Sequence, residues 1–541
     1  MSCLIIYNGE ENCTLKSSNR TTFLYRIGAG RVSGRDLISL NDPKRLQHTA
    51  LTLRDPYTEW IFSLNQKFIS QKLIDEELSL FFLTDLSNKR NELFDTYEAI
   101  ANLCLIRERL KDEEIEEVEL FGADRAFVES IRSIFPTSRV LVRRRRTERV
   151  RLGRRLMADA LYSIRVIAAS LINLSIPKQK ITERPVGKKR YFFSFFPQTF
   201  NNQLSEIRYG KMVGPNDAYL VSIIADGMHQ QVPIRDYPRL AATLRSPKFS
   251  LIDRNFRVRD LNRAVSRYCK FHWFRYRERK TKFVFNDIVI SRYIRQELIW
   301  STSRVARLAV VERALDRTIR SLGISELVYP NFEYAFGRMI SALVGRKYRD
   351  IVRIGFNHGD YSWRFVNYFL AEGEAASNPP YLAHCPIPDR VWAEDELCAE
   401  IYRYNGYNNV EIMTRVERLA YLAKIKPRKL SRFALIAGGL HDGSALLQCM
   451  YKIIAANPNV QFLFKAHPRA RNIYLEKLPA LQNLQVIDMP IEDLLAYVGV
   501  VYATYSGVGV EASRLGIRTV LVDMPGRVSW SKLLDYQETH I

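Results

Sequence analysis

Residues 433–468 read FALIAGGLHDGSALLQCMYKIIAANPNVQFLFKAHP, and this stretch decides the fold. The apolar run 433–437 leads through a glycine-containing loop into a helical pattern over 444–458, and a second apolar run follows at 460–465. A strand, a helix and a further strand in this order are typical of a parallel sheet. The alternation continues to residue 525, so the sequence predicts a doubly wound, Rossmann-like α/β unit over 426–541.

Glycine and polar residues follow the strands of this unit where those strands are expected to end. They are Gly439, Lys465, His467, Pro468, Arg469, Ser506, Gly507 and Val508. Because the carboxyl ends of strands in a doubly wound sheet meet around one crevice, we expect these residues to lie close together. Cations and a helix N-terminus attract phosphate, so the set predicts a nucleotide-phosphate site. Glu511, one turn into the following helix, is expected to accept the hydroxyls of a ribose.

Two further α/β regions precede this unit. Strands such as CLIIYN (3–8) and LSLFFLTDL (78–86) alternate with helical stretches and predict an N-terminal Rossmann-like part over 1–142. Strand patterning resumes at 191 and continues around long helices, which predicts a second α/β domain over 191–425.

The segment 143–190 differs from both neighbours in composition. It opens with RRRRTERVRLGRR (143–155), which carries eight arginines against one glutamate. A helical pattern follows, whose two faces are apolar (Met157, Ala160, Leu161, Ile164, Ala168, Leu171, Ile172) and polar (Asp159, Tyr162, Ser163, Ser170, Asn173). One interpretation is docking on an anionic membrane surface, with Arg143, Arg144, Arg145 and Arg146 as its contacts. The other is an ordinary helix packed on a sheet, with a solvated basic loop before it and a linker over 177–190.

The overall charge narrows the choice of partners. The chain has 541 residues and a formal net charge of +23, which favours nucleic acid, an anionic membrane surface or phosphorylated substrates. No RNP, zinc-finger or helix-turn-helix signature is present, so nucleic acid is disfavoured. The seven cysteines form no C-x-x-C pair, the N-terminus lacks the pattern of a signal peptide, and no apolar run reaches about 20 residues. We therefore expect a cytoplasmic protein that does not span a membrane.

Two motifs in order carry a resemblance to a known family. LFKAHPRA (463–470) is followed by ATYSGVGVEASRLGIRTVLVDMP (503–525). The pair resembles the C-terminal half of bacterial GT-B glycosyltransferases of surface polysaccharides, including sialyl- and polysialyltransferases and the CDP-glycerol glycerophosphotransferases of teichoic acid synthesis. VYPNFEYAFGRMISAL (328–343) and IVRIGFNHGDYSW (351–363) look like the acceptor-side half of a surface-carbohydrate-biosynthesis family. The resemblance covers about 325–530 well, 190–325 loosely and the first 190 residues hardly at all.

The resemblance implies a fold, an activity and roles for named residues. The fold would be GT-B, with two Rossmann-like domains facing across a cleft, and 191–425 would hold the acceptor. The activity would be sugar transfer from a nucleotide-activated donor to a glycan or lipid-linked acceptor of capsule, lipopolysaccharide or O-antigen, without a metal or other cofactor. His467 and Pro468 match the donor-phosphate loop, Ser506 and Gly507 the serine loop, and Glu511 the ribose acid. His358 would be the general base, with Asp360 or Glu333 orienting or replacing it.

Several alternatives remain open on the sequence. The acid-acid-glycine triplet of sialyltransferases is reduced to ADG (225–227) and HDG (441–443), which weakens the case for a CMP-linked sialyl donor. Transfer of a phospho-alditol from a CDP donor would use the same phosphate site. A basic nucleic-acid-binding protein and a non-catalytic scaffold are further options. Singly, His358 reads equally well as a hydrogen-bonded loop histidine, Glu333 as half of a structural ion pair, and the basic strand end as a solvated loop.

Overall fold

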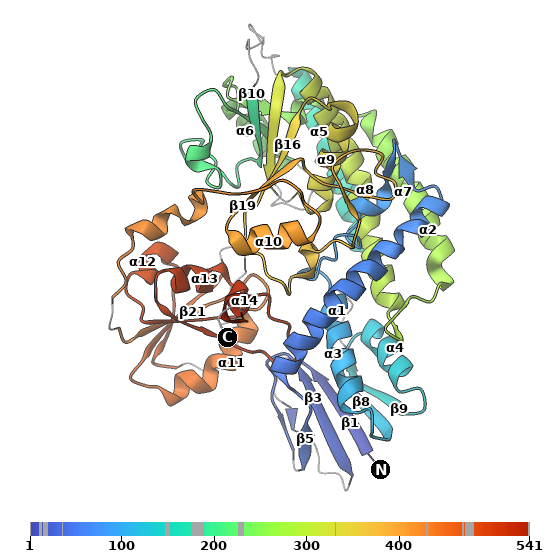
Figure 1. The fold of residues 1–541 in the computed structure, drawn as a ribbon, viewed down its shortest axis with the longest axis vertical. Helices are drawn as coiled ribbons and strands as arrows, with labels where there is room; N and C mark the ends of the chain where they lie inside the picture. The colour runs from blue at the N-terminus through green and yellow to red at the C-terminus, as the bar shows by residue number, and fades with distance from the viewer. Residues whose placement is uncertain are drawn as a thin grey trace.

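In the residues that the structure describes, three large parallel sheets, each part of an α/β unit, organise the fold (Figure 1). The computed structural model describes residues 2–9, 13–14, 20–34, 36–145, 152–175, 189–224, 232–330, 332–428, 431–467, 470 and 481–538. We call the three the N-terminal, middle and C-terminal units.

The N-terminal unit has a five-stranded sheet in the order β5-β3-β1-β8-β9. Its strands are β1 (Ser2–Asn8), β3 (Thr21–Ile27), β5 (Leu37–Ser39), β8 (Ile115–Ala123) and β9 (Arg139–Arg145), and its helices include α1 (Pro43–Ser63), α3 (Thr96–Arg109) and α4 (Arg125–Ile134). All four pairings are parallel. Counting along the chain, the strand order is third, second, first, fourth, fifth, which is the Rossmann order.

The middle unit has a seven-stranded sheet in the order β12-β11-β10-β15-β16-β19-β20. Its strands are β10 (Lys189–Phe195), β11 (Ala218–Ser222), β12 (Phe249–Leu251), β15 (Ile324–Pro330), β16 (Val352–Phe356), β19 (Arg390–Ala393) and β20 (Val410–Ile412). Its helices include α5 (Leu152–Ser175), α6 (Tyr237–Thr243), α7 (Asp260–Arg277), α8 (Ser291–Arg320), α9 (Ala335–Lys347) and α10 (Glu396–Tyr404). The first five strands repeat the Rossmann order, and two more extend the sheet on the side of β16.

The C-terminal unit repeats the order again, as β23-β22-β21-β24-β25. Its strands are β21 (Phe433–Ala437), β22 (Gln461–Lys465), β23 (Leu484–Val486), β24 (Val500–Ala503) and β25 (Arg518–Leu521). Its helices in the described residues are α11 (Gly443–Ala456), α12 (Ile491–Leu495), α13 (Gly507–Arg514) and α14 (Lys532–Glu538). The predicted α/β class, with doubly wound parallel sheets, is confirmed, and the structure contains three Rossmann-like sheets.

One local expectation is wrong. The stretch 78–86 is not a strand: only β7 (Leu78–Ser79) is extended, and η1 (Leu80–Leu83) is a 3-10 turn because the Ser79 hydroxyl accepts from the Phe81 amide. Its four residues are fully buried, so apolarity here reflects burial and not a sheet. In α5, the 19 residues Leu156–Leu174 are long and apolar enough to cross a membrane by length and composition alone, with a mean hydropathy of 1.3, and the expectation of a protein that does not span a membrane stays a prediction.

The C-terminal unit is attached to both others by its last residues. The Gly28 amide of the N-terminal unit donates to the Pro525 carbonyl at 2.8 Å, and the Asn102 amide donates to the Gly526 carbonyl at 2.9 Å. Gly526 has a φ of 65° and lies against Ile27, so a side chain there would be strained and would clash. Beyond it, α14 crosses to the middle unit, where buried Asp535 pairs with Arg364. Figure 1 shows α14 between the C-terminal unit and α10.

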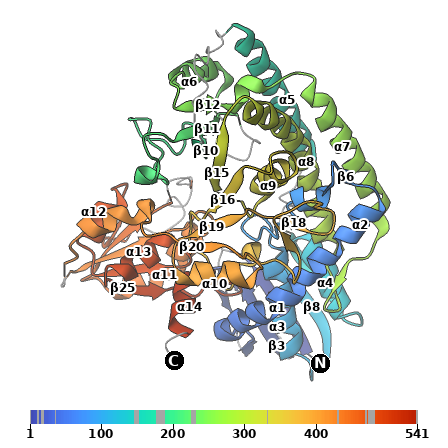
Figure 2. The ribbon, with the colours of Figure 1, turned by 45° about the horizontal axis from the view of Figure 1, so that its top comes forward.

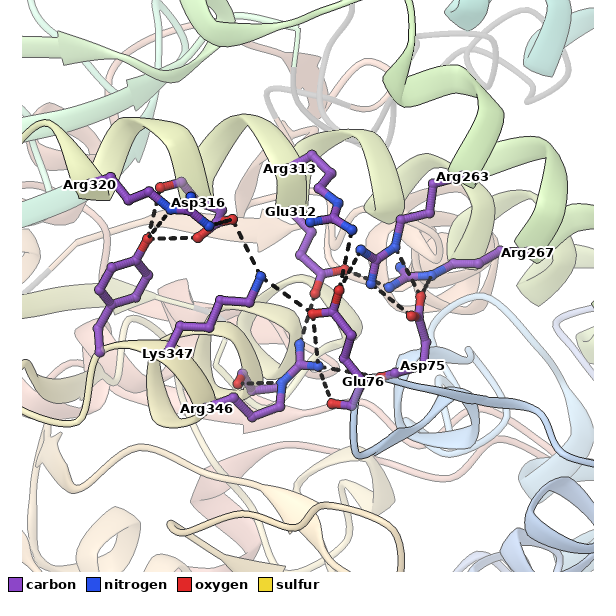
Figure 3. A network of polar contacts seen from close by, with 12 residues as sticks. Asp75, Glu76, Arg263, Arg267, Glu312, Arg313, Asp316, Arg320, Arg346 and Lys347 are labelled. Atoms are coloured by element: carbon purple, nitrogen blue, oxygen red, sulfur yellow. Dashed lines mark hydrogen bonds and ion pairs between the residues drawn. The ribbon is translucent and has the colours of Figure 1, made fainter.

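A buried ion-pair network fixes a hairpin of the N-terminal unit to three helices of the middle unit (Figure 3). The hairpin is β6 (Ile74–Asp75) with β7, and its Asp75 accepts from Arg263 and Arg267 of α7 at 2.8 and 2.6 Å. Glu312 of α8 lies at the centre and accepts from Arg267 at 2.5 Å and Arg346 of α9 at 2.8 Å. Burial alone would raise the pKa of Glu312, but Arg267, Arg346 and Arg263 lower it to about 2.

Glu312→Gln is expected to destabilise the fold by about 3 kcal/mol, because it leaves buried guanidinium groups without their carboxylate. In the wild type this contribution is present above the unfolded pKa of 4.5 and is lost as the pH falls towards about 2. Urea unfolding at neutral pH and at about pH 3 measures both effects. The exposed pair partner Glu396→Gln is the matched control, with an expected change within about 0.5 kcal/mol. Equal unfolding free energies for both variants would contradict the assignment.

Candidate active site

The strand ends of the C-terminal unit lie side by side. The register sets Ala437 of β21 level with Lys465 of β22 on one side and Ala503 of β24 on the other. Leu521 of β25 is level with Ala503, so the loops after four strands leave the same edge of the sheet. Lys465 is partly exposed there, and its ammonium lies 4.0 Å from Asp488.

The other expected phosphate contacts are only partly described. His467 is partly exposed two residues after β22, and its carbonyl accepts from the Ala470 amide. Pro468 and Arg469 lie outside the described residues. Ser506 and Gly507 stand at the start of α13, where Ser506 is the N-cap and makes no side-chain capping bond. Val508 packs against the apolar core of the unit. Phosphate binding by this set stays a prediction.

A cavity of about 200 Å³ lies between the strand ends of the C-terminal unit and the N-terminal unit. Its lining from the C-terminal unit includes His441, Asp442, Thr504, Tyr505, Asp523 and Trp530. The facing wall is the segment 91–98, with Asn91, Glu92, Asp95 and Glu98. The cavity therefore opens where loops after β21, β24 and β25 converge.

Three side chains in this lining have buried polar atoms that lack a hydrogen-bond partner among the residues that the structure describes. They are both amide atoms of Asn91, one carboxylate oxygen of Asp442 and the indole nitrogen of Trp530. Asn91 and Asp442 are 8% and 7% exposed. Buried polar groups are rarely left unpaired, so the wall is suited to a ligand that carries both donors and acceptors.

Asp442 is held in place from two sides. The Thr504 hydroxyl donates to one carboxylate oxygen, and burial raises the pKa of the Asp442 carboxyl. The other oxygen lies so close to Gly439 that any Cβ there would clash, which explains a glycine after β21. The sequence offered a weak signal, the HDG triplet, for Asp442, but none for Asn91 or Trp530, which come from loops distant in the chain.

The middle and C-terminal units meet at the start of α13. Asp360, in the loop after β16, lies so near Gly507 that a Cβ on the glycine would be 3.0 Å from its Oδ2. Of the predicted site residues, Asp360, Gly507 and Glu511 are thus brought into one region. Gly507 allows the carboxylate loop of one sheet to approach the helix N-terminus of the other.

Arg418 links three carboxylates in this region. It lies in η7 (Glu417–Lys424), the connection between the middle and C-terminal units. Its guanidinium donates to Asp360 at 3.0 Å and to Glu394 at 2.6 and 2.9 Å, and it lies 3.8 Å from Glu511. Glu394, whose side chain is fully buried, also pairs with Arg514 of α13 at 3.2 Å. Sequence reasoning missed Arg418 and Glu394, because neither follows a recognisable motif.

Glu511 already has partners in the structure. Its Oε2 accepts from the Tyr421 hydroxyl at 2.7 Å, and burial raises the pKa of its carboxyl. A ribose at this position would replace or share the Tyr421 hydrogen bond, and the ribose role stays a prediction.

His358, the expected general base, and Glu333, which was expected to orient or replace it, lie in different environments. His358 is partly exposed in the loop after β16, whose neighbouring Asn357 is fixed by hydrogen bonds to Glu394 and Gly359. Glu333 is 5% exposed, and the structure contains neither an ion pair nor a hydrogen bond to its carboxylate among the described residues. The Tyr361 hydroxyl is near this carboxylate, and it too lacks a hydrogen-bond partner among the described residues. Burial raises the pKa of Glu333 to about 7. The ion-pair interpretation of Glu333 is therefore wrong.

Of the four arginines expected to contact a membrane surface, Arg143 to Arg146, only Arg143 has a side chain that the structure describes. Arg143 ends up in β9, where its guanidinium donates to Glu119 at 2.8 Å. Arg144 and Arg145 continue β9, but their side chains and all of Arg146 lie outside the described part of the chain. Within the described ranges, no group of three or more His, Cys, Asp or Glu side chains could hold a metal ion.

Comparisons with known proteins give only distant structural likenesses. No family model matches the chain, and no curated protein matches it. Phytolacca americana UGT2, complexed with UDP-2fluoro-glucose and pterostilbene, is 8% identical over 62% of this chain and 81% of its own, with a TM-score of 0.31. The wall teichoic acid polymerase TagF is 12% identical over 69% and 79%, with 0.28, and the glycosyltransferase SnogD from Streptomyces nogalater is 12% identical over 62% and 81%, with 0.26. At such low scores, the α/β assignment rests on this chain's own sheets: three parallel sheets in the Rossmann strand order.

Proposed function

We propose that the protein is a GT-B-type glycosyltransferase that transfers a sugar from a nucleotide-activated donor to a glycan or lipid-linked acceptor. One observation carries the proposal: Asp360, in a loop at the carboxyl edge of the middle sheet, lies close to Gly507 at the N-terminus of α13, at the carboxyl edge of the C-terminal sheet. Ligands of doubly wound sheets bind at these edges. A cytoplasmic role in surface polysaccharide synthesis agrees with the motifs 463–470 and 503–525.

In the proposed reaction, the C-terminal unit binds the donor and the middle unit activates the acceptor. Lys465, His467 and the amides at the start of α13 hold the donor phosphates and stabilise the charge that develops on the departing nucleotide. His358 removes the proton from the acceptor hydroxyl as it attacks the anomeric carbon. The polar cavity beside Asp442 receives the part of the donor that carries hydrogen-bond donors and acceptors. No step in this scheme requires a metal ion.

His467→Ala is expected to weaken nucleotide binding about tenfold or more, because a charge-assisted contact to phosphate is removed. His358→Ala is the matched control, since it should leave nucleotide binding unchanged while abolishing transfer. A thermal-shift panel of CMP, CDP, UDP, GDP and TDP identifies the nucleotide, and titration of the best one measures both variants.

The outcomes separate the candidate functions. Stabilisation by a nucleotide that fails with His467→Ala supports the proposed site. Stabilisation by CDP-glycerol with release of CMP would move the function to phospho-alditol transfer. Absence of any nucleotide effect, together with tight binding of duplex DNA, would overturn the proposal in favour of a nucleic-acid-binding protein.

A further inference from the structure

Helix α5 packs against the protein with its polar side and leaves its apolar side exposed. Its exposed large side chains are Leu156 (48%), Met157 (61%), Leu161 (51%), Ile164 (59%), Leu171 (58%) and Leu174 (83%). They recur at helical spacing and form one stripe, here called the α5 stripe. A single soluble chain rarely exposes a contiguous apolar surface of this kind, so the stripe points to a partner.

Specific contacts prevent the helix from turning this stripe inward. Asp159 accepts from the Ser303 hydroxyl at 2.6 Å and from Arg307 at 2.9 Å, both on α8. Near the other end, the Asn173 amide donates to the Asp253 carbonyl at 2.8 Å and accepts from the Tyr237 hydroxyl at 3.0 Å. Val166 and Ala169 between them are fully buried. The polar contacts therefore hold the apolar stripe on the outside.

Helix α7 flanks the same part of α8 and adds aromatic and basic side chains. Arg275 of α7 contacts Thr302, next to the Ser303 that binds α5. Trp273 and Tyr276 are 56% and 50% exposed, and their rings stack with centroids 5.6 Å apart. The exposed basic residues at this end of α7 and in the 3-10 turn that follows it, η5 (Glu278–Lys280), are Lys270, Arg277, Arg279 and Lys280. In Figure 2, α5 and α7 both lie on the outside of the middle unit, with α8 between them and the sheet.

We propose that the α5 stripe and the Trp273–Tyr276 end of α7 dock together on an anionic lipid surface. The apolar side chains enter the acyl boundary, the two aromatic rings lie at the headgroup level, and the basic residues contact lipid phosphates. The helix lies in the plane of the interface: spanning the bilayer would bury Asp159 in lipid and break its ion pair with Arg307. A second copy of the chain fits less well, because it would place the basic ends of two α7 helices against each other in a chain of net charge +23.

The test uses the full chain and flotation with vesicles. The wild type is expected to float with vesicles of phosphatidylcholine and phosphatidylglycerol and to remain unbound with phosphatidylcholine alone. Leu161→Glu with Ile164→Glu removes two inserted side chains and adds two repelled charges, so binding should fall roughly a hundredfold. The matched control is Ile207→Glu with Ile453→Glu, at two exposed apolar positions elsewhere (56% and 41%), and it should float like the wild type.

Each result decides the proposal. Loss of flotation in the α5 variant, with unchanged thermal unfolding and unchanged binding of the control, supports it. A wild type that stays unbound with anionic vesicles, or an α5 variant that floats as well as the wild type, would overturn it. Elution of the wild type as a dimer and of the α5 variant as a monomer would assign the stripe to contact between copies. A second variant, Trp273→Ser with Tyr276→Ser, should weaken flotation if α7 belongs to the same surface.

Discussion

Glu333→Gln is expected to slow transfer about a hundredfold or more and, at the same time, to stabilise the fold above neutral pH. Glu333 follows β15 at the carboxyl edge of the middle sheet, and its carboxyl lies beside Tyr361, which is next to Asp360. The carboxyl is buried, and within the described ranges it has no hydrogen-bond partner. A buried carboxyl without a partner lowers the stability of the fold. Such destabilising groups are typical of functional sites, where the reaction requires them.

The pH dependence of stability follows from the pKa of Glu333. Burial raises it to about 7 in the folded protein, against an ordinary value of 4.5. The contribution of Glu333 to stability is therefore most favourable below pH 4.5, decreases as the pH rises, and reaches its lower level above about pH 7. The neutral glutamine avoids the desolvated charge, so Glu333→Gln should gain about 3 kcal/mol relative to wild type between acidic and alkaline pH.

Urea unfolding at about pH 5 and about pH 8 measures the effect of Glu333→Gln on stability. Its effect on transfer is measured by release of the nucleotide from a donor that carries the nucleotide identified by thermal shift. Glu297→Gln is the matched control: Glu297 is 2% exposed, and burial raises its pKa to about 8. Neither Glu297 nor Thr96, whose hydroxyl donates to it, lines the cavity, so the Glu297→Gln variant should show the same sign in stability and unchanged transfer. Full transfer activity in Glu333→Gln would remove Glu333 from the site.

The repetitive parts of this fold could be predicted from its sequence. In the C-terminal unit, β21, α11, β22, β24, α13 and β25 all lie where the alternation of apolar runs and helical patterns placed them. Local pattern suffices there because each buried parallel strand reads as a short apolar run. The prediction of a strand at 78–86 was wrong because an apolar run does not distinguish a strand from another buried segment. Four fully buried residues in a 3-10 turn give the same apolar pattern.

Orientation and long-range pairing could not be predicted. A helical wheel separates the two faces of α5, but the inner face is decided by partners such as Arg307 and Asp253, which are distant in the chain. The same holds for the cavity, where the wall 91–98 faces loops more than 300 residues later. Of the expected site, the strand ends followed from the Rossmann pattern, whereas Arg418 emerges only from the three-dimensional contacts among Asp360, Glu394 and Glu511.

Arg418→Ala is expected to destabilise the protein by about 3–5 kcal/mol and to slow transfer at least about a hundredfold. The guanidinium sits in the connection between the middle and C-terminal units and neutralises carboxylates from both. Without it, Asp360, Glu394 and Glu511 repel one another across the contact at the start of α13. The two halves of the proposed site would separate, and a small misplacement of reacting groups is enough to lose most of the rate. Arg418→Lys keeps the charge but loses the forked geometry, so an intermediate loss is expected.

The sign of the pH effect distinguishes this explanation from simple loss of packing. Burial already raises the pKa of Glu394 and of Glu511, and removing Arg418 raises both further. Protonation then relieves the repulsion, so the destabilisation by Arg418→Ala should be smaller at about pH 5 than at about pH 8. Glu394→Gln in the Arg418→Ala background should restore part of the stability, because it removes the most buried of the three charges. A penalty that is independent of pH and unaffected by Glu394→Gln would mean that Arg418 acts by packing alone, and the two units would then need another explanation for their alignment.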